Sequence, residues 1–151
     1  MSVIKPPGSL KHLAKSRKKV FLSGSIDNGS ATDWQAVVAG KLDREDIIIF
    51  NPRRDGWNGE IEQSATTREF VEQVEWELNA MNIADIILMH FEPGTKSPIT
   101  LLELGLYAGL NPEKLVVHCP EGFWKKGNVD VVCRFYGIKT VVDIDEMVGS
   151  V

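Results

Sequence analysis

The sequence predicts an α/β fold: one doubly wound, Rossmann-like domain built on a five-stranded parallel sheet. Short segments that are apolar throughout alternate along the chain with longer segments that have helical spacing. Strands without polar alternation are typical of a parallel sheet covered on both faces, and right-handed crossovers then place helices on each face. The length of 151 residues fits one domain with a substantial core.

Five apolar runs are the expected strands, and turn-forming residues follow them. Val20-Phe21-Leu22 stops at Ser23-Gly24-Ser25, and the isoleucine-rich run 47–50 stops at Asn51-Pro52. Proline has no amide hydrogen and cannot continue a central strand, while glycine and serine favour turns. The expected strands span residues 20–22, 47–50, 84–90, 115–118 and 140–142.

Segments between these strands have the apolar spacing of amphipathic helices. In the first helix Trp34, Val37 and Val38 are expected on one side, and Thr32 or Asp33 is placed to cap the N-terminus. In the second helix the residues spaced for burial are Phe70, Val71, Val74, Leu78 and Met81. The expected helices span residues 33–42, 68–82, 99–110 and 129–136, with a short helix after the last strand.

Residues 1–17 are expected to form a tail outside the α/β domain, which then spans residues 18–151. Pro6-Pro7-Gly8 interrupts regular structure, and residues 11–19 are rich in basic side chains. The simplest interpretation is a solvated arm. The alternative is an arm that contacts an anionic partner or a neighbouring subunit.

Composition and charge exclude several classes of protein. Hydrophobic residues make up 43% of the chain and the formal charge is −4, which is typical of a globular domain and too apolar for a disordered chain. An acidic chain lacks the basic face of a duplex-DNA binder. We therefore expect a small-molecule partner and no nucleic-acid polymer.

Cysteine and histidine usage predicts neither a disulfide framework nor a metal site. The two cysteines, Cys119 and Cys133, form no CxxC pair, and the three histidines are scattered. We expect no metal, no cofactor and a reducing, cytoplasmic location. No apolar run reaches the ~18–20 residues of a membrane span, so no membrane partner is expected.

The loop after the first strand is a candidate ligand loop. In an open parallel sheet, ligands bind beyond the carboxyl ends of the strands, near the point where the strand order switches. This loop contains Gly24, Ser25, Ile26 and Asp27, and small residues let backbone amides approach a ligand closely. It matches neither the dinucleotide fingerprint nor the P-loop, and a tight turn without a ligand is the alternative.

The loop after the second strand contains groups suited to a nucleotide. Asn51 opens it, Arg53 and Arg54 can hold a carboxylate or phosphate, and Trp57 can stack on a base. The alternative is that the arginines pair with an acidic helix and serve the structure alone.

Carboxylates on the second helix are candidates for proton transfer. Helix 68–82 carries Glu72, Glu75 and Glu77. Glu75 and Glu77 diverge by about 200° around the helix, so at most one of the two points into a given site. The alternative is a solvated charged face.

Glu103 lies among leucines in the first turns of helix 99–110. Burying a carboxylate there costs free energy unless the group is hydrogen-bonded or takes part in the protein's function. The helix N-terminus and the hydroxyls of Ser97 and Thr100 are expected to keep it ionised, so that it can attack an anomeric carbon. The alternative is a structural glutamate bonded to the loop backbone.

Five segments carry a resemblance to a known family: 21–26, Asn51-Pro52-Arg53-Arg54, Trp76-Glu77, Ala84-Asp85 and Ser97-Pro98-Ile99-Thr100-Leu101-Leu102-Glu103-Leu104-Gly105. Together they resemble the nucleoside 2-deoxyribosyltransferase superfamily and its nucleotide N-glycosidase relatives, above all the subgroup called nucleoside 2-deoxyribosyltransferase-like. The resemblance covers roughly residues 19–142. It implies a flavodoxin-like parallel sheet.

The resemblance also implies an enzyme that cleaves the N-glycosidic bond of a nucleoside or nucleotide. Glu103 matches the family's nucleophile, which forms a covalent glycosyl-enzyme, and Glu77 falls where a second carboxylate manages the base and its proton. Ser97 matches the serine that contacts the 5′-phosphate in the hydrolase branch. A homo-oligomer, dimer or larger, is implied because family sites are often completed across a subunit boundary. Whether another base or water accepts the sugar stays open.

Two positions depart from the family pattern. Asp27 stands where the hydrolase branch has arginine, and an acid there opposes a 5′-phosphate. Glu77 stands where the family usually has aspartate. These departures keep a second hypothesis open, which is a non-catalytic nucleotide-binding or sensing module on the same fold.

Overall fold

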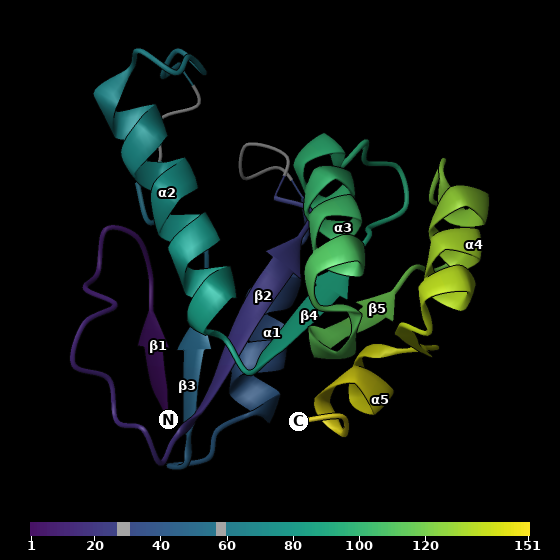
Figure 1. Cartoon of the computed structure of the whole chain (residues 1–151), viewed down its shortest axis with the longest axis horizontal. Coiled ribbons are helices and arrows are strands. Elements are labelled where there is room, and N and C mark those ends of the chain that lie inside the picture. Colours follow the sequence, from purple (N-terminus) through teal and green to yellow (C-terminus); the bar gives the residue numbers. More distant parts are fainter. Residues whose placement is uncertain (27–30, 57–59) are drawn as a thin grey trace.

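The computed structural model describes residues 1–26, 31–56 and 60–151 (Figure 1). Across these residues six strands form one sheet in the order β1-β3-β2-β4-β5-β6, and all its neighbouring strands are parallel. The strands are β1 (Ser2–Ile4), β2 (Lys18–Gly24), β3 (Ile47–Phe50), β4 (Ile86–His90), β5 (Leu115–His118) and β6 (Lys139–Val141).

Helices cover both faces of this sheet, as the doubly wound prediction requires. Figure 1 shows α2 and α3 in front of the strands and α1 behind them. The helices are α1 (Trp34–Lys41), α2 (Arg68–Ile83), α3 (Pro98–Leu110), α4 (Lys126–Tyr136) and α5 (Ile144–Val148), with a 3₁₀ turn at Pro112–Lys114. The α/β class and the parallel sheet are therefore confirmed.

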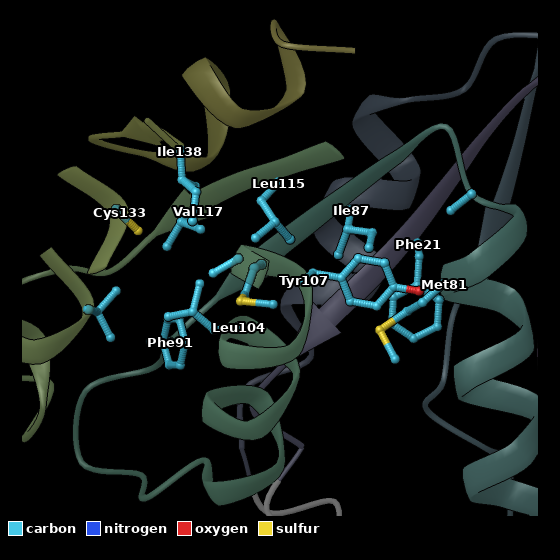
Figure 2. Close-up of a cluster of buried hydrophobic side chains, with 14 of the residues drawn as sticks. Phe21, Met81, Ile87, Phe91, Leu104, Tyr107, Leu115, Val117, Cys133 and Ile138 are labelled. Atoms are coloured by element: carbon cyan, nitrogen blue, oxygen red, sulfur yellow. The ribbon is translucent and has the colours of Figure 1, made fainter. Parts of the chain in front are cut away.

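Two apolar clusters lie on the opposite faces of the sheet. Side chains of α2, α3 and α4 pack with one set of strand residues, and side chains of α1 and α5 pack with the other. Figure 2 shows the first cluster, in which the Tyr107 ring lies beside Phe21 and Met81. The burial of strand side chains on both faces explains why the strands are apolar throughout.

The sheet has a sixth strand that the sequence analysis did not predict. Residues 1–17 were expected to be a tail, yet Ser2–Ile4 pairs with β3 in parallel. The segment that follows also packs on the domain, because the Trp76 indole donates to the Gly8 carbonyl at 2.8 Å. Leu10 and Leu13 pack against the first apolar cluster. A strand of three residues next to Pro6-Pro7 gives too short a pattern to be read from the sequence.

The helices lie close to their predicted positions, but two of their buried faces differ from the prediction. Asp33 caps α1 as predicted, accepting from the Ala36 amide at 3.0 Å. Val37 and Leu78 were predicted to be buried and are exposed. In α2 the buried side chains are Gln73, Trp76, Ala80 and Met81. The buried face is rotated because the N-terminal segment covers the Trp76 side of α2, a contact that helical periodicity alone does not contain.

The carboxyl ends of the central strands meet at one edge. Gly24 of β2 lies opposite His90 of β4, and His90 lies opposite His118 of β5. The chain leaves β2 for β3 on one side and returns to β4 on the other, so the strand order switches at β2. The loops after β2 and β4 adjoin there, since the Ser25 amide donates to the His90 carbonyl at 3.2 Å. This is the place where a ligand is expected in such a sheet.

Candidate active site

Two carboxyl groups, one from α2 and one from α3, interact electrostatically. Glu103 lies in the second turn of α3 and is 8% exposed, and Glu77 lies in α2 and is partly buried. They are close enough that the negative charge of Glu77 raises the pKa of Glu103. Below them the Tyr107 hydroxyl of α3 donates to Asn82 Oδ1 of α2 at 2.8 Å and holds the two helices together.

Glu103 is held by a hydroxyl from the central strand. Ser23 Oγ, near the end of β2, donates a short hydrogen bond to Glu103 Oε2. Burial raises the pKa of Glu103 to about 8, and the Ser23 bond partly opposes that rise. Ser97 and Thr100 were expected to supply the hydroxyl. The signal that was missed is the alternation of β2, which places Ser23 on the same face as Phe21.

Glu77 is held by an amide from its own helix. Gln73 Nε2, one turn earlier, donates to Glu77 Oε1 at 2.6 Å and to the Pro52 carbonyl at 3.1 Å. Burial raises the pKa of Glu77 to about 7, and the Gln73 bond opposes this. Glu72 and Glu75 are exposed, and Glu72 pairs with Arg68 at 3.0 Å. Of these three glutamates, Glu77 is therefore the one whose charge reaches Glu103.

Three hydroxyl groups cluster where α3 begins. Ser25 Oγ lies 3.0 Å from Thr95 Oγ1 and makes a short hydrogen bond with Ser97 Oγ, and Thr95 Oγ1 lies 2.8 Å from Ser97 Oγ. The Glu92 amide donates to Ser25 Oγ at 3.0 Å. Hydroxyls beside a helix N-terminus suit the oxygens of a sugar or an anion. Thr95 was not predicted, because its position depends on how the loop after β4 folds back.

Gly24 and Ile26 flank Ser25 in the loop after β2. A Cβ added at Gly24 would lie 2.5 Å from the His90 carbonyl oxygen and 2.6 Å from the Trp34 ring, so this position requires glycine. Ile26 is partly buried. At Gly24 the close approach is to the backbone of the neighbouring strand β4 and to Trp34, and ligand binding by this loop stays a prediction. Asp27 lies outside the described residues, as does Trp57 of the next loop.

The two arginines of the loop after β3 lie beside different helices. Asn51 is buried, and its Oδ1 accepts from the Arg53 amide at 2.9 Å. The Arg53 guanidinium donates to the Ala31 carbonyl at 3.2 Å and lies 3.7 Å from Asp33, next to the start of α1. Arg54 lines a cavity of about 360 Å³ beside α2, together with Pro6, Pro7, Glu72, Gln73, Glu75, Trp76 and Asn79.

No group of three or more His, Cys, Asp or Glu side chains in the described part of the chain is arranged to hold a metal ion. Within the same residues, no helix is both long and apolar enough to cross a membrane.

A family model described as nucleoside 2-deoxyribosyltransferase like matches residues 17–123. The chain belongs to the nucleoside 2-deoxyribosyltransferase-like family. The matched region of this family member includes Ser23, Gln73, Glu77, Ser97 and Glu103, and the resemblance seen in the sequence is confirmed. Membership supports a role in glycosyl transfer on nucleosides or related molecules.

Other comparisons place this member of the nucleoside 2-deoxyribosyltransferase-like family by its fold. A search of curated proteins finds no match. A solved structure titled as a conserved protein from Enterococcus faecalis V583 superimposes with a TM-score of 0.63 at 8% identity, covering 88% of this chain and 96% of the other. At that identity the likeness concerns the fold alone.

Proposed function

We propose that this protein cleaves the N-glycosidic bond of a nucleoside or nucleotide by a double displacement at Glu103. The observation that carries the proposal is the pair of partly or fully buried carboxyl groups, Glu77 and Glu103, at the switch point of the sheet. Two carboxyl groups with separate environments are what glycosyl chemistry needs, one as nucleophile and one as acid.

In the first step the Glu103 carboxylate attacks C1′ of the sugar. The bond from C1′ to the base nitrogen breaks, and the base leaves with the proton of Glu77. In the second step an acceptor, either water or another base, gives its proton to Glu77 and attacks C1′, which releases Glu103. General acid help of this kind typically contributes 10²–10⁴ in rate.

The two carboxyl groups of the empty site share the single proton that the reaction uses. Because the pKa of Glu77 is raised to about 7 and that of Glu103 to about 8, the pair holds one proton near neutral pH. Because the pKa of Glu103 is the higher of the two, the empty site holds this proton mainly on Glu103, and the reaction requires that it move to Glu77 when substrate binds. The bond from Ser23 favours the charged form of Glu103 and so lowers the cost of moving the proton to Glu77.

Substrate recognition is assigned to groups around this pair. The hydroxyls of Ser25, Thr95 and Ser97 bind the sugar or a 5′-phosphate at the N-terminus of α3. Gly24 and Ile26 shape the loop, while Asn51, Arg53, Arg54, Asp27 and Trp57 remain proposed binding residues.

The functional unit in this proposal is a homo-oligomer. Ile99, Leu102, Leu106 and Leu110 form an exposed apolar stripe along α3, and Leu102 is 68% exposed. Exposed apolar stripes of this kind mark interaction surfaces. A second copy on this stripe would lie next to the helix that carries Glu103.

The test is base release, measured by liquid chromatography, from a panel of ribonucleosides, deoxyribonucleosides and their 5′-monophosphates. Each substrate is run with and without an added acceptor base, for the wild type, Glu103→Ala and the control Glu75→Gln. Glu75 lies on α2 and is exposed, so its variant should behave as the wild type. Release that survives in Glu103→Ala would remove Glu103 as the nucleophile.

A nucleotide-binding module without catalysis is the second candidate. The observation that favours it is the raised pKa of Glu103, about 8, which leaves most of the carboxyl group protonated at neutral pH in the empty site. If no substrate in the panel releases base while a nucleotide raises the melting temperature, this second candidate is the correct one.

A further inference from the structure

The amide of Gln73 connects the proposed acid to the loop after β3. Gln73 is 9% exposed, and its Nε2 donates both to Glu77 Oε1 at 2.6 Å and to the Pro52 carbonyl at 3.1 Å. Glu77 follows Gln73 by one helical turn, so the two side chains lie on the same face of α2. We infer that Gln73 is a positioning residue that fixes the Glu77 carboxyl group against the loop after β3, an inference that rests on the function proposed for Glu77.

The orientation of this amide is determined by its neighbours. Both partners of Nε2 are oxygen acceptors, so a flipped amide would set its own oxygen against two others. In the observed orientation Gln73 Oε1 is buried and has no hydrogen-bond partner among the described residues. An orphaned buried acceptor lowers stability, and such groups are often kept where they serve function.

The loop that anchors Gln73 is itself held from the other side. The Asn51 amide donates to the Ile4 carbonyl at 3.0 Å, and Lys5 pairs with Asp55 at 2.6 Å. Pro52 therefore lies in a segment bonded to the N-terminal strand. Gln73 ties Glu77 to this fixed backbone, which restricts the directions in which the carboxyl group can point.

The same bond adjusts the acidity of Glu77. A donor to a carboxylate oxygen favours the ionised form, which opposes the effect of burial and keeps the pKa of Glu77 near neutrality. A general acid works best when its pKa lies near the working pH. Without Gln73, Glu77 would keep its proton to higher pH and would return it less readily in the second step.

The test compares Gln73→Met with the control Gln35→Met in protein whose glutamates carry ¹³C at the side-chain carboxyl. Gln35 is fully buried in α1 and both of its amide atoms lack partners in the described structure, so its variant removes a buried glutamine without touching Glu77. The Glu77 signal is identified by its loss in Glu77→Gln. We expect its pKa to rise by about 1 unit in Gln73→Met and to stay unchanged in Gln35→Met.

Kinetics give the second readout. On a substrate found in the panel, Gln73→Met should lower kcat about tenfold with little change in KM, and the alkaline limb of the pH profile should move upward. An unchanged Glu77 titration in a folded Gln73→Met protein overturns the inference. If that variant does not fold, Gln73→Asn, which is one methylene shorter, takes its place in the same titration. If the wild type releases no base at all, the proposed function fails, while the titration still decides whether Gln73 controls Glu77.

Discussion

Replacing Glu103 by glutamine should abolish turnover and at the same time change how stability depends on pH. Burial raises the pKa of Glu103 from 4.5 to about 8, a difference of about 3.5 pH units. At 1.36 kcal/mol per unit, the folded protein disfavours the ionised carboxyl group by up to about 5 kcal/mol. The folded pKa is the higher one, so its contribution to stability is complete below pH 4.5 and is lost as pH rises through 8.

The assay is urea unfolding of the wild type and Glu103→Gln at pH 5, 6, 7 and 8. Between pH 5 and pH 8 the free energy of unfolding of the wild type should fall by about 3 kcal/mol relative to that of the variant, because glutamine does not titrate. Titrating groups that do not interact with Glu103 are shared by both proteins and cancel in this difference, and repeating the comparison in a Glu77→Gln background removes the carboxyl group that does interact. Parallel pH curves for the two proteins would refute the reasoning about burial, and base release by Glu103→Gln would refute the role as nucleophile.

Three further outcomes follow from the same structure. The pH profile of kcat/KM should be bell-shaped with limbs near pH 7 and pH 8. Glu77→Gln should lose the alkaline limb and be slower by ~10²–10⁴. A single limb in the wild type would contradict the shared proton. Burial lowers the pKa of His90 to about 4, so its contribution to stability is complete above pH 6.5 and should decline by about 2.5 kcal/mol as pH falls to 4. The stability of His90→Phe, followed by circular dichroism during acid titration, should decline less. Light scattering should give a mass of at least two chains, reduced to one in a Leu102→Glu/Leu110→Glu variant, whereas a monomeric wild type with full activity would exclude the proposed oligomer.

The sequence was sufficient for features with a local period. Apolar runs located strands β2 to β6, and the isolated carboxylate among leucines pointed to Glu103. The partners of the carboxyl groups were not predictable in this way. Ser23 comes from a strand 80 positions before Glu103, and Gln73 reads as one more polar residue on an acidic helix. Such contacts depend on strand order and crossover, which bring distant segments together without leaving a periodic pattern.

The arginines of the loop after β3 illustrate the same limit of local patterns. Arg53 and Arg54 are adjacent and carry the same charge, so the sequence pattern predicts the same role for both. In the folded chain Arg53 bonds to the backbone before α1, and Arg54 lies beside α2. Neighbouring residues in an extended loop point to opposite sides, and which side faces a ligand is set by the helices around the loop.

The N-terminal strand also affects the solubility of shortened forms of the protein. A chain that begins at residue 17, where the family match begins, would lack β1 and leave Ile47–Phe50 as the edge of the sheet. That strand consists of three isoleucines and a phenylalanine with no charge or proline to discourage pairing with another chain. Exposed edges of this composition favour aggregation between molecules. Ser2–Ile4 therefore covers the edge of β3 and prevents it from pairing with another chain.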